Sequence, residues 1–323
     1  MTISKQEILE ISETRGFNPI MIEKVLYLLH LLQAMHTHPF LKDKWVLKGG
    51  TALNLFLFNL PRLSVDIDLN YIGELDREKM MEDRPKVEQA CHAVFSREGF
   101  TVKRVPTEHA GGKWRLSYTS YTGQNGNLEV DFNFMYRQPL LKPILMDSIK
   151  LGTYQAVQIP VLEKHELTAG KLAALIARTQ ARDLYDTQQI FDSLTLNTHL
   201  LRTVFVVYGS MNRLDWRTIS LSSITVGVQD IGKKLLPVLQ NHSPIAGQTE
   251  EMYGNQLVDK CRKALQSLLP FTENEQLFLE MLLDQGTINA SLLTDDLDLQ
   301  KKIQDQPLLH WKAFNVKKNK DIK

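Results

Sequence analysis

The sequence lacks the features that mark disulfide-stabilised, zinc-binding and membrane-spanning proteins. Its 323 residues include only two cysteines, Cys91 and Cys261, which provide neither a disulfide framework nor a set of zinc ligands. No apolar run approaches the roughly 20 residues that a membrane helix needs. The N-terminal stretch over residues 1–17 is charged and amphipathic, unlike a signal peptide. We therefore expect a soluble cytoplasmic protein without a membrane partner.

A strong net charge of either sign is also missing. Lys and Arg number 38 against 37 Asp and Glu, which gives a formal net charge of +1. This balance excludes a molecule that attracts nucleic acid over its whole surface, so any RNA-binding surface must be a local patch. Apolar residues make up 43% of the chain, as in ordinary globular proteins. The length suits two modest domains, or one large domain with a helical appendage.

Hydrophobic periodicity divides the chain near residue 160. Before this point we predict helices at 6–14, 19–36, 51–58 and 77–98, and strands at 45–48, 62–70, 101–106, 114–121, 128–136 and 154–160. After it, strand patterns become scarce and we predict helices at 163–194, 226–240, 250–269 and 273–284. VFVVYG at 204–209 fits either a strand or a buried helix, and the basic tail at 316–323 is expected to be mobile. The pattern predicts an α+β domain over residues 1–160 and a helical domain over residues 161–323.

A pair of aspartates lies on the polar face of one predicted strand. Asp66 and Asp68 point the same way because strand side chains alternate with a period of two. Asp131, in LEVDFNF, joins them if its strand is a neighbour, and we prefer it to Glu129 because it lies deeper between apolar residues. Three converging carboxylates repel one another without a cation, and such oxygen-rich sites suit Mg²⁺. The alternative is a solvated strand face, because the Asp-x-Asp pattern is common by chance.

Two glycines separate a predicted strand from the helix that follows it. Gly49 and Gly50 let the backbone approach a ligand closely, and free N–H groups at such a turn favour phosphate. Thr51 is a suitable N-cap for the helix, or its hydroxyl could bind a phosphate oxygen. The alternative is a tight turn before a capped helix, with no ligand.

A second polar cluster occurs in the segment 164–191. On a continuous helix, Lys171, Arg178 and Arg182 fall on one stripe, which would suit a triphosphate. Arg182 and Asp186 are four residues apart and can form a surface ion pair. The alternative is an amphipathic helix stabilised by salt bridges.

These motifs together resemble a known enzyme family. The order of the glycine turn, the Asp-x-Asp strand and the later carboxylate resembles polymerase-beta-type nucleotidyltransferases. KGGTAL at 48–53, RLSVDIDL at 62–69 and KLAALIARTQARDLYD at 171–186 resemble, more narrowly, the AbiEii/AbiGii toxins of type IV toxin–antitoxin systems. The resemblance extends to about residue 195. It implies an α+β fold, with a nucleotidyltransferase-type mixed β-sheet flanked by helices and followed by a helical C-terminal domain.

The resemblance also implies roles for individual residues. The resemblance assigns metal binding to Asp66 and Asp68, with Asp131 as the candidate third ligand. Lys171 would contact the triphosphate, and Asp186 would support the site or activate the acceptor hydroxyl, so the four candidate catalytic residues are Asp66, Asp68, Lys171 and Asp186. The candidate nucleotide-binding residues are Lys48, Gly49, Gly50, Thr51, Arg62, Ser64, Arg178 and Arg182.

The implied reaction is Mg²⁺-dependent transfer of a nucleoside monophosphate from a nucleoside triphosphate (NTP) to RNA, most simply the 3′ end of tRNA. This would block translation, and a separately encoded antitoxin is expected. Two alternatives stay open: transfer to a protein side chain, and a nucleotide-binding module without catalysis. Direct support for RNA binding is limited to basic residues such as Lys113 and Arg115, and to Trp114, Tyr118 and Tyr121, which could stack bases or fill the sheet.

Overall fold

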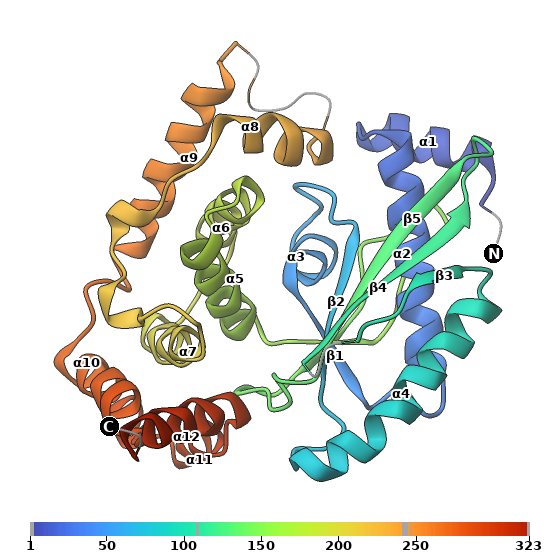
Figure 1. Ribbon diagram of the computed structural model, residues 1–323. Helices are drawn as coiled ribbons and strands as arrows, with labels where there is room; N and C mark the ends of the chain where they lie inside the picture. Colours follow the sequence, from blue (N-terminus) through green and yellow to red (C-terminus); the bar gives the residue numbers. More distant parts are fainter. Residues whose placement is uncertain (1–2, 108–109, 241–244, 246, 322–323) are drawn as a thin grey trace. The chain divides into compact units, whose positions relative to one another are not determined.

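The computed structural model describes residues 3–107, 110–240, 245 and 247–321 (Figure 1). The chain forms two compact units, each built from separate stretches of sequence. Unit 1 comprises Met1–Arg137, Pro143–Leu162 and Leu236–Ala246. Unit 2 comprises Gln138–Lys142, Glu163–Leu235 and Gly247–Lys323. Within the described residues, no helix is long and apolar enough to cross a membrane.

Unit 1 is organised around a seven-stranded mixed sheet in the order β3-β4-β5-β2-β1-β7-β6. The strands are β1 (Trp45–Lys48), β2 (Asp66–Tyr71), β3 (Thr101–Arg104), β4 (Gly111–Thr119), β5 (Asn125–Asn133), β6 (Ile144–Met146) and β7 (Ile159–Val161). β2 lies at the centre, antiparallel to β1 and parallel to β5. This confirms the predicted mixed sheet.

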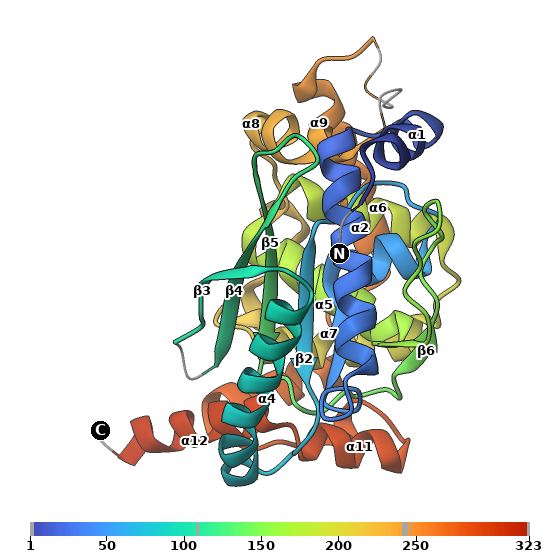
Figure 2. The ribbon, with the colours of Figure 1, turned by 90° about the vertical axis from the view of Figure 1, so that its right-hand side faces the viewer.

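The two long helices of unit 1 pack together against this sheet (Figure 2). α2 (Pro19–Thr37) begins with Asn18 capping the Ile20 N–H and with proline at the first helical position. α4 (Arg77–Arg97) begins with Asp76 accepting from two backbone N–H groups. The remaining helical segments of the unit are α1 (Lys5–Arg15), α3 (Gly49–Ala52), η1 (Leu53–Leu57) and η5 (Leu236–Val238).

Alternation along the central strands separates the core from a polar face. Ile67 and Leu69 of β2, and Val130 and Phe132 of β5, are at most 2% exposed. The residues between them are acidic and half-buried. At about 25 cal/mol per Å² of apolar surface, burying one face in this way fixes the register, because a slip of one residue would expose the apolar row. The polar face is thereby presented away from the core.

Unit 2 is helical. Its longer helices are α5 (Lys164–Arg178), α6 (Ala181–Ser193), α7 (Thr198–Ser210), α9 (Glu250–Leu265), α10 (Glu273–Glu280), α11 (Leu297–Gln304) and α12 (Pro307–Asp321). Its shorter turns are η2 (Trp216–Thr218), η3 (Leu221–Ser223), α8 (Val228–Asp230), η4 (Ile231–Leu235), η6 (Met281–Gln285) and η7 (Ala290–Leu292). Phe205, Trp216 and Phe278 are fully buried in this unit.

Glu166 of α5 binds the short segment Gln138–Lys142, which belongs to unit 2 although it lies apart from the rest of that unit in the sequence. Its two carboxylate oxygens accept the backbone N–H groups of Leu140 and Leu141, each at 2.9 Å, and the Tyr208 hydroxyl at 2.9 Å. Burial raises the pKa of Glu166 to about 7, against the opposing effect of these donors.

The structure corrects the predicted strands on two points. The strand expected over 62–70 begins only at Asp66, because the Leu63 N–H bonds instead to the distant Val238 carbonyl at 2.8 Å. The strand expected over 154–160 is displaced to β7, and Gln158 adopts a positive φ of 57° that interrupts it. β6 was not predicted at all.

The helical predictions for unit 2 also need correction. The helix expected over 163–194 breaks at Thr179, which adopts a left-handed conformation at φ 46° and ψ 46°. The helix expected over 226–240 is a series of short turns, whereas the ambiguous 204–209 lies inside α7. The tail expected to be mobile is helical to Asp321, and the last two residues of that prediction lie outside the described residues.

Candidate functional site

The turn between β1 and α3 is held against the segment that leads into β2. Gly49 has φ 76°, and a Cβ at this position would collide with Asp68 Oδ2 and lie 3.2 Å from Asp68 Cβ. A Cβ on Gly50 would lie 2.9 Å from both Arg62 Nη2 and Ser64 Oγ. The side chains that face these two positions leave room only for glycine. The two halves of the first motif, the turn and the segment 62–68, therefore pack against each other.

Thr51 connects this turn to the start of β2. It is fully buried, and its hydroxyl donates to the Asp66 carbonyl at 2.5 Å and lies 3.1 Å from Ser64 Oγ. The prediction that Thr51 caps the helix is wrong, because α3 already begins at Gly49, after Lys48. The observed bonds hold Asp66 in position, so a phosphate contact from Thr51, which stays a prediction, would require this hydroxyl to turn.

The acidic residues of the polar face are brought together by strand register. In the register of the sheet, Asp68 lies opposite Lys48 of β1 on one side and opposite Asp131 of β5 on the other. Asp66 is paired with Glu129. The expectation that the strands of Asp66 and Asp131 are neighbours is thus confirmed, and all four carboxylates are half-buried.

Lys113 and Arg115 of β4 lie beside these carboxylates. The Glu129 carboxylate forms ion pairs with Lys113 at 3.0 Å and with Arg115 at 3.1 Å. Burial raises the pKa of Glu129, but the bonds and charges of these two partners outweigh burial and lower it overall. Glu129 is therefore already neutralised by its two partners, and the choice of Asp131 as a third metal ligand stays a prediction.

Lys24 of α2 is the cation that sequence reasoning missed. Burial lowers its pKa, while the negative charges of Asp66 and Glu129 oppose that shift. It is half-buried, and its ammonium group contributes to the field around Asp66. No sequence signal could have identified it, because the approach of α2 to the sheet is a tertiary feature. Lys113 and Arg115, which the sequence offered as basic residues for RNA binding, lie on β4 opposite Asp131 and Glu129.

The donor chemistry of this face fits a divalent cation that is only partly held by protein. Asp66 and Asp68 offer oxygen ligands on one strand face, beside a turn without side chains. Within the described residues, no three carboxylate, imidazole or thiol groups converge closely enough to enclose a metal ion by themselves. Mg²⁺ commonly takes one or two carboxylates and completes its shell with water and substrate phosphates. The residues present fit that mode of binding.

The second motif forms a buried charge cluster in unit 2. Lys171 Nζ lies 2.9 Å from Asp183 Oδ1 and 2.8 Å from Asp186 Oδ2. Arg178 donates two hydrogen bonds to the Asp183 carboxylate, from Nε to Oδ2 at 2.7 Å and from Nη2 to Oδ1 at 3.1 Å. Burial raises the pKa of Asp183, but the charge of Lys171 and the bond from Arg178 outweigh burial and lower it overall. The four charges of this cluster balance.

The predicted stripe of Lys171, Arg178 and Arg182 is wrong. The break at Thr179 places Arg182 on a separate helix, α6, and this break allows α6 to return its acidic residues to Lys171. The expected surface pair of Arg182 with Asp186 is also wrong, because Asp186 is fully buried and bonds to Lys171.

Two of the aromatic residues considered for RNA stacking fill the core of unit 1. Trp114 is 2% exposed and packs edge-on against Phe95. Tyr118 is 6% exposed and packs against Tyr27. The stacking role is therefore wrong for Trp114 and Tyr118.

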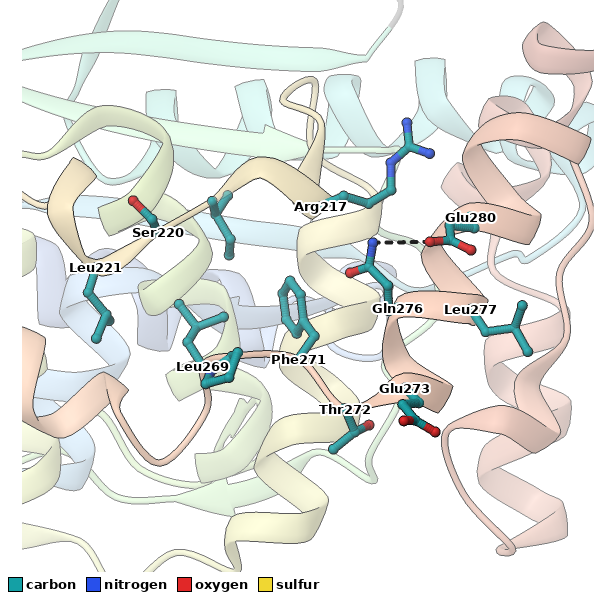
Figure 3. A pocket seen from close by; sticks show the side chains of 12 residues that line it. Arg217, Ser220, Leu221, Leu269, Phe271, Thr272, Glu273, Gln276, Leu277 and Glu280 are labelled. Atoms are coloured by element: carbon teal, nitrogen blue, oxygen red, sulfur yellow. Dashed lines mark hydrogen bonds between the residues drawn. The ribbon is translucent and has the colours of Figure 1, made fainter.

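An open pocket of about 830 Å³ lies in unit 2 (Figure 3). It is formed by the segments 217–221 and 269–280, with Phe271 and Leu277 among its apolar lining. Arg217 at its edge is already paired with Asp215 and Asp284, both at 2.7 Å. The lining contains no residue of either motif, so this pocket is separate from the candidate site.

Comparison with known proteins supports the interpretation of the two motifs. The sequence model of the family described as "Nucleotidyl transferase AbiEii toxin, Type IV TA system" matches residues 30–286, which contain both motifs. A comparison with curated protein sequences finds no match. Among solved structures, the chain is similar to MenT4, a nucleotidyltransferase toxin from Mycobacterium tuberculosis H37Rv. The TM-score is 0.59 and the identity 20%, over 94% of this chain and 98% of that chain, so this likeness shows the shared fold.

The close approach of Gly49 to Asp68 generates a first prediction. Gly49→Ala should lower the free energy of unfolding, because it combines a positive φ, at about 1–2 kcal/mol, with a collision, at about 1–3 kcal/mol. Gly123→Ala is the matched control, since Gly123 has φ 81° and nothing within 4 Å of an added Cβ. Urea unfolding of both variants measures the difference. Equal losses in the two variants would show that the contact with Asp68 is unimportant.

The buried cluster generates a second prediction. Lys171→Met should cost about 3–5 kcal/mol of unfolding free energy at pH 7, because it leaves two buried carboxylates without their shared cation. Arg178→Met is the control, and it should cost about 1 kcal/mol or less, because the Arg178 side chain is 53% exposed.

The same cluster predicts a pH dependence for this cost. Asp183 has a lowered pKa in the folded protein, so its stabilising effect is present at neutral pH and is lost as pH falls through that pKa. The deficit of Lys171→Met relative to the unmodified protein should therefore shrink as pH falls below about 4, the ordinary pKa of aspartate, towards the lowered pKa of folded Asp183. Urea unfolding at several pH values tests this, and a deficit that grows in acid would contradict the pairing.

Proposed function

The chain belongs to the AbiEii family of nucleotidyltransferase toxins from type IV toxin–antitoxin systems, and from this premise we propose its detailed reaction. We propose that it transfers a nucleoside monophosphate from an NTP to an RNA acceptor, most simply the 3′ end of tRNA, in a Mg²⁺-dependent step. Membership of a type IV system implies an antitoxin. Modification of the tRNA end would prevent aminoacylation and so stop translation.

The observation that carries this proposal is the contact between the glycine turn and Asp68. It brings a turn of two glycines beside a pair of carboxylates on one strand face. Bound Mg²⁺ would neutralise charge on the NTP phosphates and on the attacking oxygen. Asp66 and Asp68 would hold it, with Asp131 beside them as the register partner of Asp68, and the turn at Gly49–Gly50 would approach the phosphates. Arg62 and Ser64, packed on Gly50, would fix the turn.

The chemical step is an in-line displacement at the α-phosphorus. The acceptor hydroxyl oxygen forms a bond to phosphorus, the bond to the leaving oxygen breaks, and pyrophosphate departs. The hydroxyl proton passes to a base or to water. Lys24 and Lys113 add positive charge around Asp66, which favours binding of the polyanionic substrate. Catalysis of this kind depends mainly on positioning and electrostatics.

The Lys171 cluster serves the same reaction in this proposal. Lys171 would contact the triphosphate, and Asp186 would support the site or accept the proton. Either contact requires the 2.8 Å bond between Lys171 and Asp186 to open or to be shared. Arg178 and Arg182 are further candidate phosphate contacts, and Arg178 is the more exposed of the two.

One other acceptor and one other activity are consistent with the same residues. Transfer to a protein side chain uses identical chemistry and differs only in the acceptor. A nucleotide-binding module without catalysis would not need Asp66, Asp68, Lys171 and Asp186 all to be retained, and the chain has all four.

A labelling experiment tests the proposed reaction. The protein is incubated with Mg²⁺, total tRNA and each of the four NTPs, labelled in turn at the α-phosphate. Label on RNA supports the proposal, label on protein supports the first alternative, and NTP binding without transfer supports the second.

Asp68→Asn provides the third prediction. Removing one metal-binding charge should lower the transfer rate by about 1000-fold, because several kcal/mol of transition-state stabilisation is lost. The asparagine fits the same space, so the fold should be retained. Asp43→Asn is the control, because Asp43 is an exposed aspartate of the same unit outside the motif. Full activity of Asp68→Asn would disprove the assignment of Asp68.

A further inference from the structure

The last helix of unit 2, α12, exposes two aromatic side chains. Trp311 is 59% exposed and Phe314 is 64% exposed, and they are three residues apart on the same helix. The chain has four tryptophans, and the other three, Trp45, Trp114 and Trp216, are at most 2% exposed. Two large aromatic side chains exposed close together on one helix can mark an interaction site, because each could bury a large apolar area.

The exposure of these rings does not come from a loosely attached helix. Lys312 Nζ donates to the carbonyls of Ser210 at 2.7 Å and Asn212 at 2.6 Å. Leu309 is fully buried, and the Ala313 carbonyl lies 2.6 Å from the place that a Cβ on Gly286 would occupy. These contacts, all within unit 2, fix the inner face of α12 and so present the opposite face to solvent. Figure 1 shows α12 in dark red, at the C-terminal end of the chain.

The exposed rings are accompanied by positive charge. Lys317 and Lys318 are exposed, as is His310, and with Trp311 and Phe314 they fall within a stripe roughly 120° wide on the helix. Residues 307–318 include no aspartate or glutamate. A patch that combines aromatic rings with cations and has no acidic residue favours an anionic partner with flat faces. Single-stranded nucleic acid has both properties, since its bases stack on aromatic rings and its phosphates attract lysine.

We propose that the outer face of α12, formed by His310, Trp311, Phe314, Lys317 and Lys318, binds single-stranded RNA. Bases stack on Trp311 and Phe314, and Lys317 and Lys318 contact the flanking phosphates. Side chains three residues apart on a helix have Cβ atoms about 5–6 Å apart, so nearby bases of one strand can reach both rings. The inference rests on the proposed function in one respect: the RNA bound here would be the acceptor.

The exposed tryptophan supplies a direct probe. A single-stranded RNA of about 12 nucleotides, within the usual site size of such surfaces, is titrated into the full chain while tryptophan emission is recorded. Stacking on Trp311 should quench its emission and protect it from acrylamide. The buried tryptophans should respond to neither. RNA that binds without changing Trp311 emission or acrylamide access would overturn the stacking.

Affinity measurements with labelled RNA test the same face. Trp311→Ser and Phe314→Ser should each weaken binding by about 10-fold, since a stacked base contributes about 1–3 kcal/mol. Leu297→Ser is the matched control, because Leu297 is 76% exposed in the same unit and lies outside the face. Lys317→Gln with Lys318→Gln should reduce the slope of log Kd against log salt by about 1.4. Unchanged binding in the two serine variants would overturn the proposal.

Two further outcomes separate this inference from its alternatives. If sedimentation shows self-association that Trp311→Ser abolishes while RNA binding is unchanged, the face is an interface between copies and the proposal is wrong. Asp68→Asn should bind the RNA as tightly as the unmodified protein. RNA binding without nucleotide transfer would refute the proposed function but not this inference. Transfer to RNA that is unchanged in the α12 variants would refute this inference but not the proposed function.

Discussion

The contact between the Gly49–Gly50 turn and the approach to β2 is the constraint on which the first motif depends. Gly49 lies against Asp68, Gly50 lies against Arg62 and Ser64, and the next residue, Thr51, bonds to the Asp66 carbonyl. The same few atoms therefore shape the turn and aim the aspartates. A ligand that binds the backbone of this turn would meet the carboxylates as well, which explains why the two features occur together in one motif.

The ionised groups of the two motifs differ in burial. In unit 1, Asp66, Asp68 and Asp131 are half-buried, and Lys24 and Lys113 add positive charge near Asp66. In unit 2, Lys171 and Asp186 are almost completely buried and bonded to each other. A buried ion pair is expensive to form and more expensive to break, so this second cluster is suited to holding a fixed geometry. Within unit 2 this cluster holds α5 and α6 together, so any ligand contact from Lys171 must compete with its two carboxylate partners.

Much of the candidate site could be predicted because it depends on local pattern. The period of two placed Asp66 and Asp68 on one face, and the glycine pair marked the turn. The features that were missed depend on contacts between distant segments. The late start of β2 follows from a bond to Val238, and Lys24 reaches the carboxylates only because α2 crosses the sheet. The break at Thr179 has no glycine or proline to announce it, although it determines which residues meet Lys171.

The central claim is that Asp66 and Asp68 bind a divalent metal together with the phosphates of an NTP. Because the described residues contain no closed metal site, the metal should bind weakly to the protein alone and tightly in the presence of nucleotide. Calorimetric titration with Mn²⁺, with and without an NTP analogue that cannot be cleaved at the α-phosphate, measures this directly. Mn²⁺ should bind tightly only in the presence of the analogue, and this tight binding should be lost in Asp68→Asn. Equal Mn²⁺ affinity with and without nucleotide, or unchanged affinity in Asp68→Asn, would contradict it.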